Sequence, residues 1–266
     1  MNFMLSIFIS FLFASSLLAF IDEDFDGVED TQDKCLDTPF MDLVDSMGCS
    51  TISLLTPHLF DIIMGVGYSQ TNQETLEDEQ TLYTTLQFDY SYKDFSLYAT
   101  LTRYQNNSSS GLDDTLLGVN YSFNISEALH FTPAITLILP TYDSGLHNEE
   151  MDIATSATLS YYYQSFFSLA SYTYTFINDT NTMQTKYQNS SAYQLTLGYT
   201  PMQQLTVDGG FYKSGSMYQG VEDIQSLTCN VSYSLDENHF ILFYYSHGLS
   251  ESASDNYASF KFGRTF

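Results

Sequence analysis

The feature that most constrains the fold of this chain is a long series of segments in which apolar and polar side chains alternate. Residues 80–92 show the pattern: Leu82 and Leu86 fall on one face of an extended strand, and Tyr83 and Asp89 fall on the other. A period of two residues is that of a β-strand whose two faces meet different surroundings. Such segments recur from about residue 58 to the last residue, so the sequence predicts an all-β fold.

These segments have the length of a tilted strand that crosses a bilayer, about 9 to 11 residues. Their number, about 12, is even, as in single-chain bacterial membrane barrels. Lines of Ser, Thr, Tyr, Gly and Asn suit a wetted interior, whereas the inner faces of a soluble β-sandwich, the alternative fold, would be apolar. The predicted strands cover residues 58–69, 81–92, 94–105, 114–125, 129–140, 152–164, 166–177, 190–200, 203–213, 223–235, 238–247 and 256–266.

The connections between the predicted strands alternate strictly between short and long. This alternation is typical of transmembrane up-and-down barrels, which have short periplasmic turns and longer outer loops. An even strand count places both barrel ends at the short-turn side, so the N-terminus is expected in the periplasm. The short connections are Lys93 and residues 126–128, 164–165, 201–203 and 236–238; the long ones are residues 70–80, 106–113, 141–151, 178–189, 214–222 and 248–255.

The end of the chain, YASFKFGRTF over residues 257–266, alternates and finishes on Phe266. It resembles the closing strand of bacterial outer-membrane β-barrel proteins, whose terminal aromatic residue carries an assembly signal. The resemblance and the loop pattern together predict a transmembrane antiparallel up-and-down β-barrel over residues 52–266. We expect it in the outer membrane of a Gram-negative bacterium, in contact with outer-membrane lipid.

Residues 1–20 are almost entirely apolar, and Leu17-Leu18-Ala19 precedes an acidic segment. This is the pattern of an export signal peptide cleaved after Ala19 or Phe20. Because the segment has no Lys or Arg before its apolar stretch, an uncleaved membrane anchor is the alternative. No later run of about 18 apolar residues provides another helical span.

Residues 22–33 carry a spacing of carboxylates that suits calcium. Asp22, Asp24, Asp26 and Asp33 occupy positions 1, 3, 5 and 12 of a loop, Gly27 permits the sharp turn at position 6, and position 7 offers a carbonyl. Oxygen ligands in this arrangement are the ones that Ca²⁺ requires. An acidic disordered linker is the alternative.

The motif continues with Cys35, Thr38-Pro39 and then Val44-Asp45-Ser-Met-Gly48-Cys49. Residues 22–49 thereby resemble the thrombospondin type 3 repeat of outer-membrane proteins of the OmpA-like group. The resemblance implies a calcium-binding periplasmic module over residues 21–51 and a route to a periplasmic partner. It also implies the disulfide Cys35–Cys49, which an exported compartment permits. The implied calcium ligands are Asp22, Asp24, Asp26, the Val28 carbonyl and Asp33.

The formal net charge of −25, from 32 acidic and 7 basic residues, disfavours nucleic-acid binding. Most of the acids lie in the long connections, where solvated loop surface is the simplest explanation. Two alternatives are cation bridging to anionic lipid head groups and cation enrichment at a pore mouth. The third cysteine, Cys229, lies in a strand pattern and is expected to be a small buried or lipid-facing residue.

A polar barrel interior would carry a few charged and aromatic side chains. Such residues are expected to narrow the pore and to contact a small aromatic or amphipathic solute. The chain has no series of arginines that would favour anions. The predicted lumen residues are Asp61, Asp89, Asp208, Lys261, Tyr83, Tyr98 and Tyr162, with Tyr212 and Tyr257 beside them.

Residues 113–123 followed by 131–141, which end in Leu139-Pro140-Thr141, are similar to the barrel family linked to the phenol-degradation meta pathway. The leading Gly of that family's motif is absent here, and Tyr142 stands where a second Gly follows the Pro-Thr pair. The resemblance implies uptake of small, often hydrophobic, organic molecules.

Three functions are therefore compared. A passive channel for small solutes follows from a polar lumen, and a structural or adhesive barrel that displays acidic loops is the runner-up. An acyl hydrolase like outer-membrane phospholipase A is the third, but the His-x-Ser-Asn motif is absent. The most similar pair of residues is His247 and Ser250. Residues three positions apart on a strand do not share a face. No enzyme activity is predicted.

Overall fold

The computed structural model describes residues 24, 26–36, 38, 42–51, 58–71, 79–142, 150–179 and 186–266. The chain divides into two compact units, residues 1–55 and 56–266. The predicted signal segment 1–20 and the calcium ligand Asp22 lie outside the described residues. So do several acids of the long connections, namely Glu74, Glu77, Asp78, Asp143 and Glu149.

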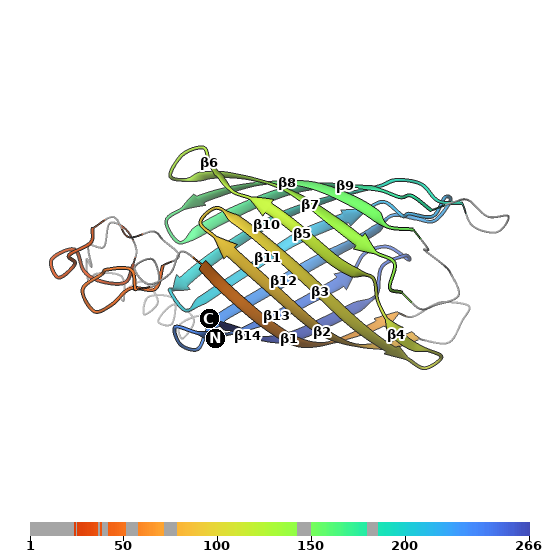
Figure 1. Cartoon of the computed structure of the whole chain (residues 1–266), viewed down its shortest axis with the longest axis horizontal. Coiled ribbons are helices and arrows are strands. Elements are labelled where there is room, and N and C mark those ends of the chain that lie inside the picture. The colour runs from red at the N-terminus through yellow and green to blue at the C-terminus, as the bar shows by residue number, and fades with distance from the viewer. Residues whose placement is uncertain are drawn as a thin grey trace, which may run out of the picture. The chain divides into compact units, whose positions relative to one another are not determined.

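The second unit is a closed antiparallel β-barrel (Figure 1). Twelve strands form the ring, in the order β1, β14, β13, β12, β11, β10, β9, β8, β7, β5, β3 and β2, and the pairing of β2 with β1 and β3 completes it. The ring strands are β1 (His58–Thr71), β2 (Glu79–Tyr92), β3 (Phe95–Asn106), β5 (Thr115–Tyr121), β7 (Leu129–Leu139), β8 (Asp152–Tyr163), β9 (Phe166–Phe176), β10 (Ser190–Met202), β11 (Leu205–Ser214), β12 (Ile224–Ser234), β13 (His239–Gly248) and β14 (Asn256–Thr265). The predicted fold class and strand number are confirmed.

Two short strands, β4 (Ser110–Leu112) and β6 (Phe123–Asn124), flank β5. The sequence predicts one strand over 114–125, whereas the structure interrupts it at Ser122, and β4 lies in the segment 106–113 that was predicted as a loop. The Asp113 amide still donates to Thr102 (2.8 Å), and the Ser122 amide to Asp94 (2.8 Å), so the chain stays beside β3. The interruption is therefore a local break in one wall of the barrel.

The barrel has two unlike rims. At the terminal rim, where β1 begins and β14 ends, successive strands are joined by short turns, and Lys93 and Gln164 take the left-handed conformation there (φ 53° in both). At the long-loop rim the connections are longer, as predicted. One boundary differs: Pro201 lies within β10, which shifts register between Tyr199 and Met202. Proline has no amide hydrogen for the ladder and is tolerated at such a bulge.

The last strand closes the ring. β14 pairs with β13 and with β1, and the amide of Phe266 donates to the Phe60 carbonyl at 2.9 Å. The Arg264 guanidinium lies 4.6 Å from the centre of the Phe266 ring. The Phe266 ring also lies 6.5 Å from the Phe60 ring on β1, between ring centres, so the terminal residue takes part in barrel closure through both its backbone and its ring.

The outer face of the barrel is apolar and the inner face is not. Met64 and Leu197 are 60% and 73% exposed on the outside, whereas Ser259 and Thr196 are buried on the inside. A soluble β-sandwich, which the sequence left as an alternative, would bury its apolar faces. None of the described residues forms a helix long and apolar enough to cross a membrane.

Candidate functional site

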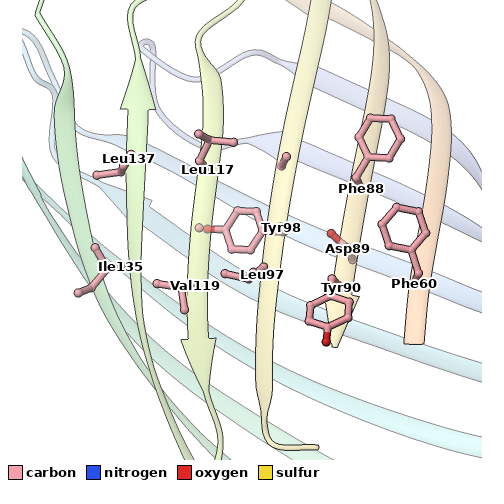
Figure 2. A pocket seen from close by; sticks show the side chains of 12 residues that line it. Phe60, Phe88, Asp89, Tyr90, Leu97, Tyr98, Leu117, Val119, Ile135 and Leu137 are labelled. Carbon is pink, nitrogen blue, oxygen red and sulfur yellow. The ribbon is translucent and has the colours of Figure 1, made fainter. Parts of the chain in front are cut away.

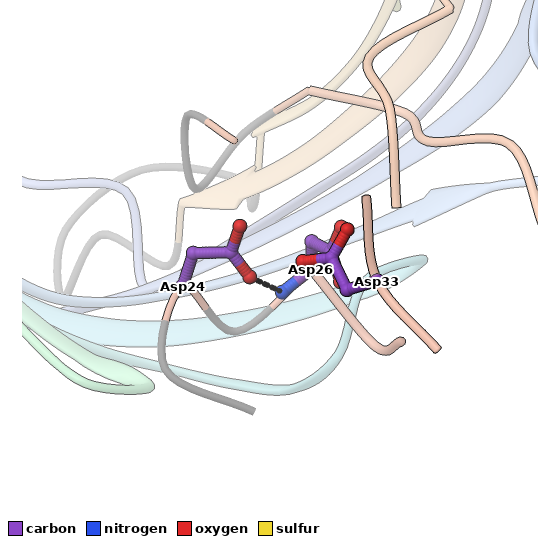
Figure 3. A group of neighbouring side chains, drawn as sticks. All are labelled: Asp24, Asp26 and Asp33. Atoms are coloured by element: carbon purple, nitrogen blue, oxygen red, sulfur yellow. Dashed lines mark hydrogen bonds between the residues drawn. The ribbon is translucent and has the colours of Figure 1, made fainter. Parts of the chain in front are cut away.

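The first unit gathers three carboxylates. Asp24, Asp26 and Asp33 each contribute one oxygen to a group in which all of these atoms lie within 4.8 Å of one another (Figure 3). Asp26 is only 2% exposed. Carboxylate oxygens packed this closely repel one another unless a cation lies between them.

Backbone amides hold the three carboxylates in place. Val28 donates to Asp26 Oδ1 at 2.8 Å, and Cys35 donates to Asp33 Oδ1 at 2.7 Å. Thr38, 14 residues further on, donates to Asp24 Oδ2 at 2.7 Å. The sequence missed this contact of Thr38, since the two residues lie 14 positions apart and no local spacing connects them.

Gly48 leaves the space that the carboxylates occupy. It has φ +76°, and a Cβ there would lie 1.9 Å from Asp33 Oδ1 and 2.9 Å from Asp26 Oδ2. Thr38 Oγ1 donates to the Gly48 carbonyl at 2.6 Å, and the adjacent Cys49 forms a disulfide with Cys35. The second half of the repeat therefore packs directly against the carboxylates, and the disulfide joins the two halves.

The donor set fits a hard divalent cation. All three side chains offer oxygen, and the buried Oδ2 of Asp33 accepts no hydrogen bond from the described residues. A buried carboxylate oxygen without a donor is costly, and a bound cation would satisfy it. Val28 contributes to this group through its backbone amide, which donates to Asp26. Binding of calcium by its carbonyl stays a prediction.

The inner wall of the barrel carries the predicted charged residues. Asp61 on β1 lies directly opposite Asp89 on β2, and both line a cavity of about 440 Å³. The other polar groups of this cavity are Gln87, Ser91, Ser96, Tyr98, Thr100 and Asn120.

Lys261 and Asp208 lie on other strands of the same inner face. Lys261 on β14 is the register partner of Gly65 on β1, and a Cβ on Gly65 would lie 2.6 Å from the Lys261 Cγ. Its stem therefore crosses β1 where no side chain stands. Asp208 on β11 accepts a hydrogen bond from Asn230 Nδ2 at 2.6 Å.

Aromatic rings cover glycines on the inner wall. The Tyr98 ring lies over Gly118 and its hydroxyl bonds Thr136 Oγ1, while the Phe167 ring lies over Gly198. Sequence reasoning missed Phe167, although a glycine inside a strand is a signal for such close approach.

The other predicted rings also take part in clusters. Tyr83 is 5.9 Å from Tyr257 between ring centres, and Tyr257 is 5.6 Å from Tyr244. Tyr162 is 6.0 Å from Phe167. The structure thus brings Tyr83 and Tyr257 together, whereas Tyr162 pairs with Phe167 and Tyr98 lies apart from both pairs, over Gly118.

A second hollow, of about 530 Å³, lies on the outer face (Figure 2). Its outward side chains come from five neighbouring strands and are apolar apart from the hydroxyl of Tyr90: Phe60, Phe88, Tyr90, Leu97, Ala99, Leu117, Val119, Ile135 and Leu137. Ala99 is the smallest of these outward side chains. Cys229, opposite Gly209 in the register, also faces outward, as the lipid-facing alternative predicted.

The long-loop rim holds a group of acids. Asp152 is fully buried, and its Oδ1 accepts a hydrogen bond from the Asn178 amide at 2.8 Å. Burial raises the pKa of Asp114, which lies between β4 and β5. The hydrogen bond from the Tyr142 amide opposes this shift, and the nearby carboxylates of Asp113, Asp152 and Asp179 add to it.

We expect the pKa of Asp114 to fall toward its ordinary value of 3.8 when Asp179 is replaced by Asn, because one repelling charge is removed. A raised pKa means that the folded rim binds the Asp114 proton more tightly than the unfolded chain. The stabilising contribution is full in acid and is lost as the pH rises through the folded pKa. Carboxyl NMR titration measures the shift, and Asp236→Asn, at the other rim, should leave it unchanged.

The residues closest to a hydrolase motif do not meet. His247 Nδ1 lies 3.3 Å from Asn256 Oδ1, while Ser250 Oγ accepts a hydrogen bond from the Gln225 amide at 2.9 Å. Each is engaged with a different neighbour.

No protein-family model matches the sequence, and neither does any curated protein. Solved structures do match. The NanC porin aligns with a TM-score of 0.54 and 11% identity, over 78% of this chain and 98% of that one. The KdgM porin in complex with disordered oligogalacturonate gives 0.51 and 12%, over 76% and 98%.

The translocator domain of the autotransporter NalP from Neisseria meningitidis aligns with a TM-score of 0.50 and 10% identity, over 79% of this chain and 88% of that one. At these identities the likeness concerns the fold alone. The chain has the fold of a transmembrane β-barrel with twelve strands in its ring.

Proposed function

We propose that this protein is an outer-membrane channel through which small solutes diffuse passively. The observation that carries the proposal is the closed ring with exposed apolar side chains outside and a polar cavity inside. Such a surface matches lipid on one side and water on the other. The likeness to the NanC and KdgM porins supports the same conclusion.

The proposed orientation places the terminal rim in the periplasm. Short turns join the strands at this rim, and both β1 and β14 have their free ends there. In bacterial barrels the short turns are periplasmic and the long loops are external. The N-terminal repeat would then be periplasmic, where a disulfide is stable and a periplasmic partner is accessible.

The proposed solutes are small and include molecules with an apolar or aromatic part. On the inner wall the Tyr98 ring lines the same cavity as the Asp61 and Asp89 carboxylates, and the rings of Tyr83 and Tyr257 lie together, a combination that binds amphipathic molecules. The KdgM porin was solved in complex with disordered oligogalacturonate, and this ligand is a ligand of KdgM.

The repeat is proposed to bind one calcium ion through Asp24, Asp26 and Asp33, with Asp22 and the Val28 carbonyl completing the set. The close grouping of the three carboxylates and the buried Asp33 Oδ2 support this. Bound calcium would neutralise their mutual repulsion and order the loop.

We expect the purified full chain to produce discrete single-channel conductance in a planar bilayer and to let small neutral sugars swell liposomes. Heat-modifiable migration in gel electrophoresis would verify that the same sample is folded. Boiled protein is the matched control and should give no conductance.

Folded protein that neither conducts nor swells liposomes would contradict the channel. The runner-up, a structural or adhesive barrel that displays its acidic loops, would then account better for the fold.

A further inference from the structure

The inner wall places two like charges against each other. Asp61 and Asp89 are direct register partners on β1 and β2, a placement that destabilises a sheet when both are ionised. Gln87 Nε2 donates to both oxygens of Asp89, at 3.0 and 2.8 Å. The buried Oδ1 of Asp61 accepts no hydrogen bond from the described residues. The pair is thus costly for the fold and incompletely satisfied by it.

A lysine stands beside this pair. The Lys261 stem crosses β1 over Gly65, and its ammonium interacts electrostatically with Asp89. Asp89 is therefore subject to one like charge, on Asp61, and one opposite charge, on Lys261. The three ionised groups leave one uncompensated negative charge beside the cavity.

The remainder of the described inner wall adds no compensating cation. Among the described residues of the ring strands, Lys261 is the only Lys or Arg that faces inward, because the register turns Arg103, Lys213 and Arg264 outward. Asp208 adds a further inward carboxylate. A solute that crosses the barrel therefore meets a net negative wall.

We propose that Asp61, Asp89 and Lys261 form a charge filter that makes the channel prefer cations, including small organic cations, over anions. This inference rests on the proposed channel function and specifies its solute class. The two carboxylates attract a cation into the cavity, and Asp61 Oδ1 offers it an acceptor. Lys261 offsets part of that attraction, so that a cation is held weakly enough to leave.

The test is the reversal potential of the full chain in a planar bilayer with a KCl gradient. The wild type is expected to favour potassium over chloride. Asp61→Asn with Asp89→Asn should lower the ratio of potassium to chloride permeability by about twofold or more, and Lys261→Gln should raise it. Asp→Asn keeps the size and shape of each side chain, so a shift of the ratio in the double variant reports the loss of charge.

Glu127→Gln is the matched control, because it removes one carboxylate from a turn at the terminal rim instead of from the wall. It should leave the permeability ratio as in the wild type. If the double variant conducts with the same ratio of potassium to chloride permeability as the wild type, the proposed charge filter is wrong, whereas the proposed channel is not contradicted. Absence of any conductance from folded protein would overturn both. A variant that fails to show heat-modifiable migration is replaced by the single Asp61→Asn, for which the same shift, of smaller size, is required.

Discussion

Gly118→Ala is expected to destabilise the barrel by about 2 kcal/mol, within the range of about 1 to 3 kcal/mol for overpacking. A Cβ at this position would lie 2.1 Å from the Tyr98 ring, so the ring has to leave its place against β5. Its hydroxyl then loses the hydrogen bond with Thr136. Urea unfolding in detergent micelles, followed by tyrosine fluorescence, measures the loss.

Gly209→Ala is the matched control. This glycine also lies within a strand, but a Cβ there would meet nothing closer than the Thr228 carbonyl oxygen at 3.5 Å, an ordinary contact. It should change the free energy of unfolding little.

The double variant Gly118→Ala with Tyr98→Ala identifies the cause. If the clash with the ring is responsible, the cost of Gly118→Ala should almost vanish once the ring is gone, with a coupling energy of about 1 kcal/mol or more. Additive effects of the two substitutions would mean that Gly118 matters for another reason.

Gly48→Ala is expected to weaken calcium binding by the N-terminal repeat by about 100-fold, at the upper end of the effects of residues behind metal ligands. The new Cβ would lie 1.9 Å from Asp33 Oδ1, and the left-handed φ of +76° adds strain. Asp33→Asn should weaken binding as strongly, since it removes charge from the group. Calorimetric titration of the calcium-stripped full chain measures both.

Glu29→Gln is the control for total charge, because it removes a carboxylate of the repeat that is outside the group of three. The Glu29→Gln variant should bind calcium with an affinity near that of the wild type. Calcium should also slow proteolysis within residues 24–51, and chelation should reverse this while the barrel keeps its heat-modifiable migration. Equal affinity of Gly48→Ala and the wild type would contradict the proposed site.

Much of the fold could be predicted from the sequence because successive residues of a barrel strand face lipid and lumen in turn, so that apolar and polar side chains alternate along it. Leu82, facing outward, and Tyr83, facing inward, differ by one position, and the same parity runs along the whole of β2. Boundaries were less exact where one residue breaks the ladder. Pro201 lies inside β10 because a bulge absorbs its missing amide hydrogen, and no local pattern distinguishes a bulge from a turn.

The candidate sites were predictable to different depths. In the repeat, Asp24, Asp26 and Asp33 could be chosen because loop spacing fixes which carboxylates meet. Thr38 and Gly48 could not, since they approach the carboxylates only after the second half of the repeat folds back. In the barrel, parity identified which face Asp61 and Asp89 share, but not that they lie opposite each other.

The sequence by itself determined the period of the strands, their number and the alternation of loop lengths, because each follows from neighbours along the chain. Only the tertiary structure decided the register between strands, and with it the facing of Asp61 and Asp89 and the passage of Lys261 over Gly65. The physical reason is that a slip of two residues between strands preserves every inward and outward assignment while it changes every cross-strand partner.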